Sequence, residues 1–296
     1  MEQRETPHYM FTRNDPFDKE APIKLLTEQV MSSVEYMRSI RDFEVPEGGL
    51  ALWLLGQNSF LLKSSTGPLL SIDPYLTDRC SALYPDAPFR LHRQLPIFIQ
   101  PEDFDVDLVL FTHSHADHFD AATIERLPIK TSALFIGPWE AYDRFGEVGI
   151  LPSRGRLIHA NQEMEVDGIH IHGTFALPTD HTDLNHIGYV LKFANGITFY
   201  NSGDTQYCEL LEYLHAFHLD ICTICINTGF HNLSHMEAAK LVKRIKPKVV
   251  IPFHYDMMVN NVGNPDMFRV FLNIVGADSD CHIMPYYAPW VYQKTS

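Results

Sequence analysis

A short apolar run followed at once by histidines and carboxylates is the feature that most constrains this chain. Residues 106–111, Val-Asp-Leu-Val-Leu-Phe, have the composition of a strand buried on both faces. The chain then continues Thr-His113-Ser-His115-Ala-Asp117-His118. Imidazole and carboxylate groups need partners when buried, and a divalent metal ion can partner all of them together. The stretch therefore predicts a metal site, with room for two ions, and the alternative is a solvated polar loop.

The composition supports a packed core and opposes polyanionic partners. At 296 residues and 45% hydrophobic content, the chain can form one large domain or two average ones. A formal net charge of −14 argues against nucleic acid or an anionic membrane surface as partner. No apolar run approaches the roughly 18 residues that a membrane span needs, and the first residues lack the apolar region of a signal peptide. We therefore expect a cytoplasmic protein.

The cysteines favour the same compartment. They are five in number and scattered, which is not the pattern of a disulfide framework. Cys222 and Cys225 form a C-x-x-C inside an apolar, strand-like run. We interpret this pair as core packing rather than as a zinc knuckle or a redox pair.

Hydrophobic periodicity predicts helices alternating with strands. A proline-bearing loop over residues 75–102 has no clear period and holds a basic cluster, Arg79, Arg90, His92 and Arg93. Surface solvation explains this cluster simply, and a lid or an anion-binding role is the alternative. The predicted elements are an amphipathic helix at 23–41, an antiparallel meander at 50–55, 60–63 and 69–72, a hairpin at 187–193 and 197–200, and helices at 207–217, 234–245 and 265–275.

Side chains suited to metal binding recur where predicted strands end. Asp73, His181, Asp204 and His254 each stand at such a position, like the histidine-rich stretch. Strand ends are where sites assemble in layered α/β folds. Taken singly, Asp204 could cap a helix, His254 could be a core histidine and His181 could be a loop residue. Together with the histidine-rich stretch, they predict one common site.

In order and spacing, this set resembles the metallo-β-lactamase superfamily. The resemblance runs from about Leu50 to His254, through the histidine-rich stretch, a later His181, Ser202-Gly-Asp204 and Pro252-Phe-His254. It implies an α/β (α+β) fold, a four-layer αββα sandwich with an N-terminal helical extension. We expect residues 1–45 to form that extension and residues 46–296 a single hydrolase domain of the same unit.

The resemblance also implies a role for each ligand. Two divalent ions are expected, Mn²⁺ or Zn²⁺, with iron also compatible with imidazole and carboxylate donors. His186 is an alternative to His181. We prefer His181, because His181 lies in a strand-end loop between two aspartates. The implied roles are His113, His115 and His181 at the first ion, Asp117, His118 and His254 at the second, Asp204 as a bridge, and Asp73 orienting a ligand histidine.

Within the superfamily, the chain is similar to the L-ascorbate-6-phosphate lactonase (UlaG-like) group. The likeness lies in residues 52–56, 202–207 and 248–256, whereas the tail after His254 is shorter than in those lactonases. It implies a homo-oligomeric, metal-dependent hydrolase of a small anionic or phosphorylated sugar lactone, in which a metal-activated hydroxide attacks the carbonyl. Asp117 and Asp204 are then the expected catalytic carboxylates, with Asp117 passing a proton to the leaving alkoxide.

Two other functions remain open. One is a phosphodiesterase acting on a cyclic nucleotide or a small phosphodiester. The other is a metal-binding scaffold or sensor without turnover. In every case His231, in a loop before a capped helix, and Tyr255, next to His254, are predicted substrate contacts.

Overall fold

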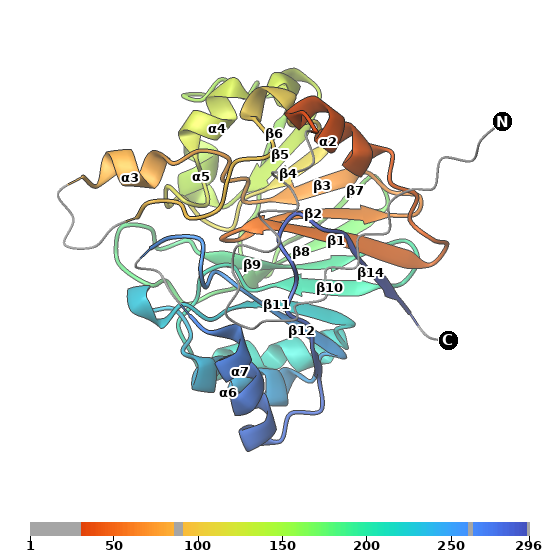
Figure 1. Ribbon diagram of the computed structural model, residues 1–296, viewed down its shortest axis with the longest axis vertical. Coiled ribbons are helices and arrows are strands. Elements are labelled where there is room, and N and C mark those ends of the chain that lie inside the picture. Colours follow the sequence, from red (N-terminus) through yellow and green to blue (C-terminus); the bar gives the residue numbers. More distant parts are fainter. Residues whose placement is uncertain (1–30, 86–90, 260–262, 295–296) are drawn as a thin grey trace.

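The strands of this chain form two sheets stacked face to face. The computed structural model describes residues 31–85, 91–259 and 263–294, and within them each sheet has seven strands. The orders are β14-β1-β2-β3-β4-β5-β6 and β13-β12-β11-β10-β9-β8-β7. Figure 1 shows helices on the outer side of each sheet. The predicted αββα sandwich, an α/β (α+β) fold, is confirmed.

The first sheet begins as the predicted antiparallel meander and continues with parallel strands. β1 is buried along its whole length, because it pairs with a strand on either side and lies between two apolar layers. From β3 onward the strands are parallel, so their carboxyl ends share one edge. The bounds are β1 Gly49–Gly56, β2 Ser59–Ser64, β3 Leu69–Ile72, β4 Leu108–Leu110, β5 Leu134–Gly137, β6 Gly155–Leu157 and β14 Trp290–Gln293.

The second sheet has the same design. The predicted hairpin around Asn195-Gly196 joins β9 and β10 in antiparallel pairing, and β10 to β13 then run parallel. β11 contains Cys222 and Cys225, both buried in the core as predicted. The bounds are β7 Glu163–Val166, β8 Ile169–Phe175, β9 Ile187–Lys192, β10 Thr198–Asn201, β11 Ile221–Cys225, β12 Val249–Phe253 and β13 Asp280–Cys281.

The main core fills the space between the sheets. Phe60 of β2 meets Phe253 of β12 edge to face, with ring centroids 5.7 Å apart. Leu62 of β2 and Ile171 of β8 belong to the same buried cluster. Burying one such side chain stabilises the fold by roughly 1.5–3 kcal/mol. This packing fixes the two sheets relative to one another, and therefore the loops at their shared edge.

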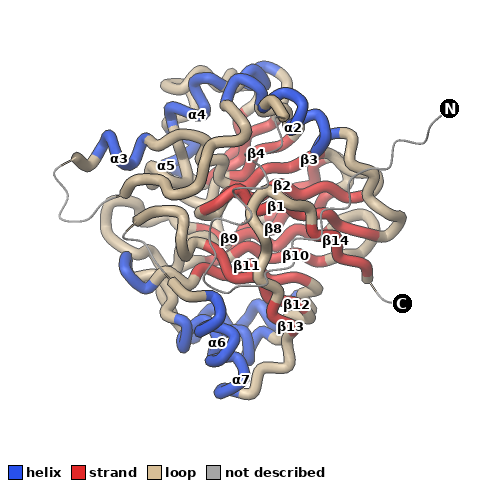
Figure 2. Tube along the Cα trace, in the orientation of Figure 1, coloured by secondary structure: helices blue, strands red, loops and turns tan. Residues whose placement is uncertain are grey.

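Helices complete the outer layers (Figure 2). Met37, Ile124 and Ala141, from three different helices, pack in a second core on the first sheet, while Leu241 and Phe268 pack on the second. The segment predicted as a helix at 207–217 is a 3-10 helix, Glu209–Phe217. The helices are α2 Ser33–Arg41, α3 Arg79–Leu83, α4 Ala121–Arg126 and α5 Trp139–Asp143, then α6 His235–Ile245 and α7 Pro265–Val275.

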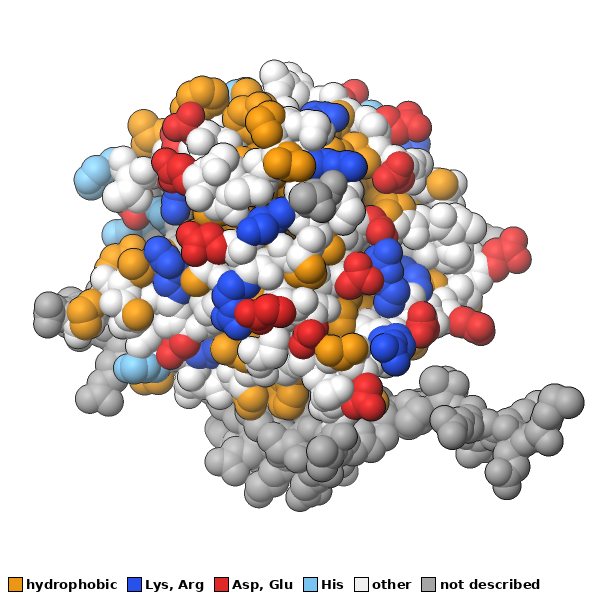
Figure 3. Space-filling model, turned by 90° about the horizontal axis from the view of Figure 1, so that it is seen from above, with side chains coloured by type: hydrophobic (Ala, Val, Ile, Leu, Met, Phe, Trp, Pro, Cys, Tyr) orange, Lys and Arg blue, Asp and Glu red, His pale blue; other side chains and the backbone are white. Residues whose placement is uncertain are grey.

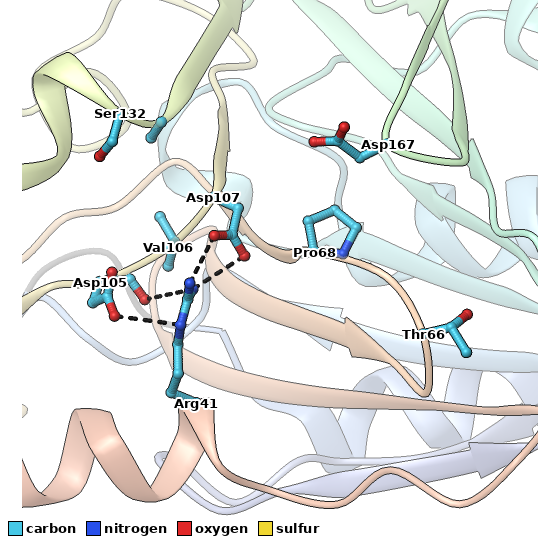
Figure 4. Close-up of a pocket in the computed structure, with 9 residues that line it drawn as sticks. Arg41, Thr66, Pro68, Asp105, Val106, Asp107, Ser132 and Asp167 are labelled. Carbon is cyan, nitrogen blue, oxygen red and sulfur yellow. Dashed lines mark hydrogen bonds and ion pairs between the residues drawn. The ribbon is translucent and has the colours of Figure 1, made fainter.

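Helix α2 is tied to the edge of the first sheet that lies away from the strand-end loops. It begins at a capping box of Ser32 and Glu35, and residues 23–30 of the predicted helix lie outside the described residues. Arg41 donates two hydrogen bonds to Asp107, 2.7 and 3.1 Å long, just before β4 (Figure 4). The pocket around this ion pair is lined by residues 105–107, before β4 begins, and is therefore separate from the carboxyl ends of β3 and β4.

Charges are mixed on the outer surface over the first sheet. Seen from that side, acidic and basic side chains are interspersed with scattered apolar ones (Figure 3). Among the helices of the described residues, none is long and apolar enough to cross a membrane.

Candidate metal centre

Histidines and carboxylates from both sheets converge at the edge where the parallel strands end. Asp73 follows β3, and the histidine-rich stretch follows β4. Asp204 follows β10 and His254 follows β12, which brings the second sheet's contribution to the same place. A backbone hydrogen bond of 3.0 Å from Ile187 N to Thr112 O joins the two sheets beside these loops. The predicted convergence of strand ends is therefore present in the structure.

One cluster consists of His113, His115 and His186. Nε2 of His113 lies 3.0 Å from Nδ1 of His115, and the ring centroids of His113 and His186 are 3.9 Å apart. One potential ligand atom from each residue falls within 4.8 Å of the others. His186 is 3% exposed, its Nδ1 faces the backbone carbonyl of Asp204 at 3.2 Å, and its buried Nε2 has no hydrogen-bond partner. A metal ion is a fitting partner for such an atom.

The structure corrects the placement of His181. We expected this residue beside His113 and His115, but it is solvent-exposed and outside the histidine and carboxylate clusters of the described chain. The reason is the shape of the loop before β9. Asp183 accepts a hydrogen bond of 2.8 Å from Ser114 N, which leaves His181 outside, while His186 enters the site at the foot of β9. The alternative residue, His186, is the one brought to the cluster.

A second cluster consists of Asp117, His118 and His254. Nε2 of His254 lies 3.3 Å from Nε2 of His118 and 3.3 Å from Oδ2 of Asp117. The backbone of His254 has a φ of +59°, in the left-handed region, and this turns the chain directly after β12. All three residues were predicted to share one ion, and the structure brings them together.

Asp204 stands against the second cluster. Its Oδ1 lies 3.4 Å from Nε2 of His118 and 3.5 Å from Nε2 of His254, and it accepts no hydrogen bond although it is buried. Its Oδ2 accepts a hydrogen bond of 2.6 Å from Asn232, which holds the carboxylate in place. Because its backbone carbonyl contacts His186, the residue touches members of both clusters.

Asp73 lies beneath the centre, where it was expected. Its Oδ2 is 2.7 Å from Nδ1 of His118, so Nε2 of that ring is left to face the cluster. The same carboxylate accepts hydrogen bonds from Thr112 N at 2.8 Å and from Asn58 Nδ2 at 2.7 Å. A carboxylate behind a histidine fixes the tautomer and orientation of a metal ligand.

The electrostatics favour cation binding. Burial would raise the pKa of Asp204, yet His254 and His118 hold that pKa below the usual carboxyl range. Burial lowers the pKa of His113, and the neighbouring histidines lower it further. Burial would also lower the pKa of His118, but Asp204 and Asp117 raise it well above the usual value. The site thus presents ionised carboxylates, a neutral His113, and one His118 proton that a metal ion would replace.

The residues present fit a pair of divalent ions. Two triads supply imidazole and carboxylate atoms without a thiolate, a donor set that suits zinc, manganese or iron. The unpartnered atoms, Nε2 of His186 and Oδ1 of Asp204, are buried among these donors. Leaving such atoms without a partner costs free energy, and a cation would satisfy both.

A pocket of about 730 Å³ opens onto the two clusters. Asp117 and Asp204 line it, as does His231, one of the two predicted substrate contacts. Tyr255, the other, does not line it: its side chain is buried and packs near Tyr286, with ring centroids 6.4 Å apart. The other lining residues are Cys80, Tyr84, Leu91, His115, Ala116, Thr179, Asp180, Thr182, Asn227, Gly229, Phe230, His254 and Met258.

The basic cluster of the 75–102 loop does not line this pocket in the described part of the chain. Arg93 instead donates hydrogen bonds to the carbonyls of Tyr75, Thr77 and Leu95. His92 lies 2.7 Å from Ser81 Oγ, and Arg90 lies outside the described residues. Arg93 and His92 therefore contact other parts of the loop rather than facing the pocket.

Sequence reasoning missed Gln57, Asn58 and Asn232. Gln57 donates a hydrogen bond of 2.7 Å to Asp117, and Asn58 donates one of the same length to Asp73. The sequence Gly56-Gln-Asn-Ser marked only a turn between two strands. The clue in this sequence is a pair of adjacent amide side chains with no charged residue beside them. Amides are common in exposed turns, so the clue does not identify a buried site.

Comparison with known proteins agrees with this geometry. Residues 51–254 match the family model for the Beta-lactamase superfamily domain. A metal-dependent hydrolase of Pyrococcus horikoshii is 30% identical over 226 residues, covering 73% of this chain and 88% of that protein. Another from a Roseiflexus species is 30% identical over 184 residues, covering 58% and 73%.

Solved structures share the fold. A metallo hydrolase from the hyperthermophilic archaeon Ignicoccus hospitalis has a TM-score of 0.67 and 21% identity, over 83% of this chain and 100% of that one. At this level of identity the likeness concerns the fold alone.

Proposed function

We propose that this chain, which belongs to the metallo-β-lactamase superfamily, is a metal-dependent hydrolase that cleaves a small ester or lactone. The observation that carries the proposal is the pair of donor triads, three of whose members, His115, Asp117 and His254, line one pocket. We assign His113, His115 and His186 as the residues that would hold one ion, and Asp204, which contacts members of both clusters, as a further ligand. Asp117, His118 and His254 would hold the other ion.

Metal ions held there would supply Lewis acidity and lower the pKa of a water molecule towards neutrality. The chain's own groups would do the rest. Asp117 and Asp204 line the pocket as carboxylates. Asp117 would accept the proton lost by the attacking water molecule and then pass it to the departing alkoxide. Oδ2 of Asp117 is held by Gln57, which fixes the direction of that carboxylate. Nδ1 of His118 is held by Asp73 in the same way.

The lining of the pocket bears on the substrate. Within the described chain, none of its lining residues is lysine or arginine, and its charged members besides histidine are aspartates. Tyr84, Leu91, Phe230 and Met258 give it an apolar wall. Apart from the proposed metal ligands, the lining offers, among the residues described, one carboxylate, Asp180, and no lysine or arginine that would bind the remote phosphate of a phosphorylated sugar lactone, the substrate that the lactonase resemblance implies. We therefore propose a neutral lactone or ester carrying an apolar group.

A substrate panel tests this proposal. The protein loaded with Mn²⁺, and separately with Zn²⁺, is incubated with unphosphorylated alkyl lactones, with a phosphorylated sugar lactone and with bis-p-nitrophenyl phosphate. We expect turnover of the neutral lactones and little of the other two. The His113→Ala variant is the control for contaminating hydrolases.

Three other results of this substrate panel would contradict the proposal. Hydrolysis of the phosphodiester alone would replace the lactonase proposal with a phosphodiesterase. Preference for the phosphorylated lactone would refute the apolar-substrate proposal. Tight metal binding without turnover of any substrate would favour a scaffold or sensor.

A further inference from the structure

The turn between β1 and β2 is buried in an unusual way. Hairpin turns generally lie on the surface, where water satisfies their polar groups. Here Gln57 is 1% exposed, and Asn58 and Ser59 are 0% exposed. We call these three residues the amide turn. Buried polar side chains require hydrogen-bond partners, so the partners of the amide turn indicate its role.

Gln57 reaches two residues of the second cluster. Its Nε2 donates a hydrogen bond of 2.7 Å to Oδ2 of Asp117. Its backbone carbonyl accepts a hydrogen bond of 3.3 Å from the backbone N–H of His254, across the gap between the sheets. The residue has a φ of +49°, which a non-glycine residue adopts at a cost. The surrounding packing therefore holds Gln57 in this position against its backbone preference.

Asn58 is linked to His118, the other histidine of the second cluster, through the carboxylate of Asp73. Its Nδ2 donates a hydrogen bond of 2.7 Å to the same Asp73 oxygen that lies 2.7 Å from Nδ1 of His118. Ser59 Oγ donates a hydrogen bond of 2.6 Å to the backbone carbonyl of Asp73. Two residues of the amide turn thus fix the aspartate that orients His118.

Asn58 also links the turn to the second sheet. It forms a reciprocal amide pair with Asn201 at the end of β10, with hydrogen bonds of 2.7 and 3.1 Å. Oδ1 of Asn201 accepts a further hydrogen bond of 2.9 Å from Gly203 N, next to Asp204. The amide turn therefore holds the segment that carries Asp204 as well.

The first cluster is supported by other elements. Oγ1 of Thr182 lies 3.0 Å from Nε2 of His115, and the carbonyl of Asp204 lies 3.2 Å from Nδ1 of His186. Thr182 belongs to the loop before β9, which is far from the amide turn in sequence. Asp73 also has a link to this cluster, because Thr112 Oγ1 donates a hydrogen bond of 2.5 Å to Asp73 and lies 3.0 Å from Nδ1 of His113. Within the amide turn, Gln57 is therefore the residue whose contacts with the proposed ligands, Asp117 and His254, fall in the second cluster.

We propose that the amide turn, through Gln57, is a positioning device for the ion held by Asp117, His118 and His254. This inference rests on the proposed metal centre. Hydrogen bonds behind metal ligands typically change metal affinity by about 10- to 100-fold. Loss of the Gln57 amide should therefore weaken that ion by about this factor and leave the ion at His113, His115 and His186 unchanged.

Manganese titration of the metal-free full chain tests the proposal. In Gln57→Met the side chain keeps a similar length but loses its N–H donor. Isothermal titration with Mn²⁺ should find two tight sites in the wild type, and one tight and one weakened site in the variant. Thr182→Val is the matched contrast, because it removes a partner of His115 and should weaken the other site.

The double variant shows whether the two changes act on different ions. If they do, Gln57→Met with Thr182→Val leaves no tight site, because distant effects add. If one tight site survives in the double variant, both residues act on the same ion and the proposal is wrong. Equal weakening of both sites by Gln57→Met alone would also overturn it.

A second measurement distinguishes a variant that fails to fold from one that folds but binds metal more weakly. Thermal unfolding of each metal-free variant reports whether the chain folds, and Gln57→Leu, which also lacks the N–H donor, carries the test if Gln57→Met does not fold. A wild type that binds no Mn²⁺ would refute the metal centre itself. A wild type with two sites that Gln57→Met leaves unaltered would refute only the role of the amide turn.

Discussion

Oδ2 of Asp73 lies 2.7 Å from Nδ1 of His118, and both side chains are fully buried. Asp73 follows β3 and His118 lies in the stretch after β4, so the contact joins the ends of two adjacent parallel strands. Because Nδ1 is occupied, Nε2 of His118 is directed towards His254 and Asp204. The pairing of β3 with β4 in the first sheet thus orients His118 towards residues that follow strands of the second sheet.

Replacing Asp73 should remove the contact that orients the imidazole of His118. In Asp73→Asn the amide cannot accept hydrogen bonds from Asn58, Thr112 and His118 in the way that the carboxylate does. We expect about a 10- to 100-fold loss of metal affinity or activity. The measurement is a metal titration beside a circular dichroism melt of the metal-free protein. Unchanged affinity in a folded variant would contradict the role given to Asp73.

His186 and His181 provide a matched pair of substitutions. His186→Ala removes the buried imidazole next to His113 and should abolish one metal site and most of the hydrolytic activity. His181→Ala changes an exposed side chain and should leave metal content and activity close to those of the wild type. Metal analysis of both purified variants checks this. The reverse pattern would restore His181 as the ligand.

Metal binding should release a proton from His118. Burial favours its neutral form, but Asp204 and Asp117 outweigh burial and raise its pKa well above the usual value. The metal-free site therefore holds this proton at neutral pH, and a metal ion must displace it. Apparent metal affinity should then rise as pH rises. Titration calorimetry in two buffers of different ionisation enthalpy detects the proton, and identical heats in both would exclude its release.

Removing the metal should lower the stability of the folded chain. Ligands that bind only the folded state stabilise it by about 2.7 kcal/mol when present at a hundred times their dissociation constant. In addition, Asp204 Oδ1 and His186 Nε2 lose their proposed partner when the ions leave. We expect a chelator to lower the melting temperature in calorimetry, and readdition of Mn²⁺ or Zn²⁺ to restore it. A melting temperature unaffected by chelation would argue against a bound ion.

The sequence predicted the fold, and the convergence of strand-end histidines and carboxylates, because both depend on local pattern. Apolar runs gave the strands, and Asn195-Gly196 gave the hairpin that β9 and β10 form. The structure brings Asp204 and His254, which follow β10 and β12, to the same edge as expected, since a strand end has a fixed position in a parallel sheet.

The errors fall in loops whose course depends on tertiary contacts. His181 and His186 lie in the same loop, and the bond between Asp183 and Ser114 decides which of them enters the site. The hydrophobic periodicity of the sequence carries no information about such a contact. Gln57 and Asn58 look like ordinary turn residues, and only the docking of the second sheet, through Asn201, buries them. Arg93 belongs to the basic cluster for which anion binding was the alternative to surface solvation, and its guanidinium donates hydrogen bonds to backbone carbonyls of its own loop.

Anomalous diffraction from crystals grown with Mn²⁺ tests the central claim most directly. The claim is that two clusters at one edge of the sandwich bind two ions. We predict two manganese peaks, one among His113, His115 and His186 and one among Asp117, His118 and His254. A single peak, or no peak at these six side chains, would contradict it.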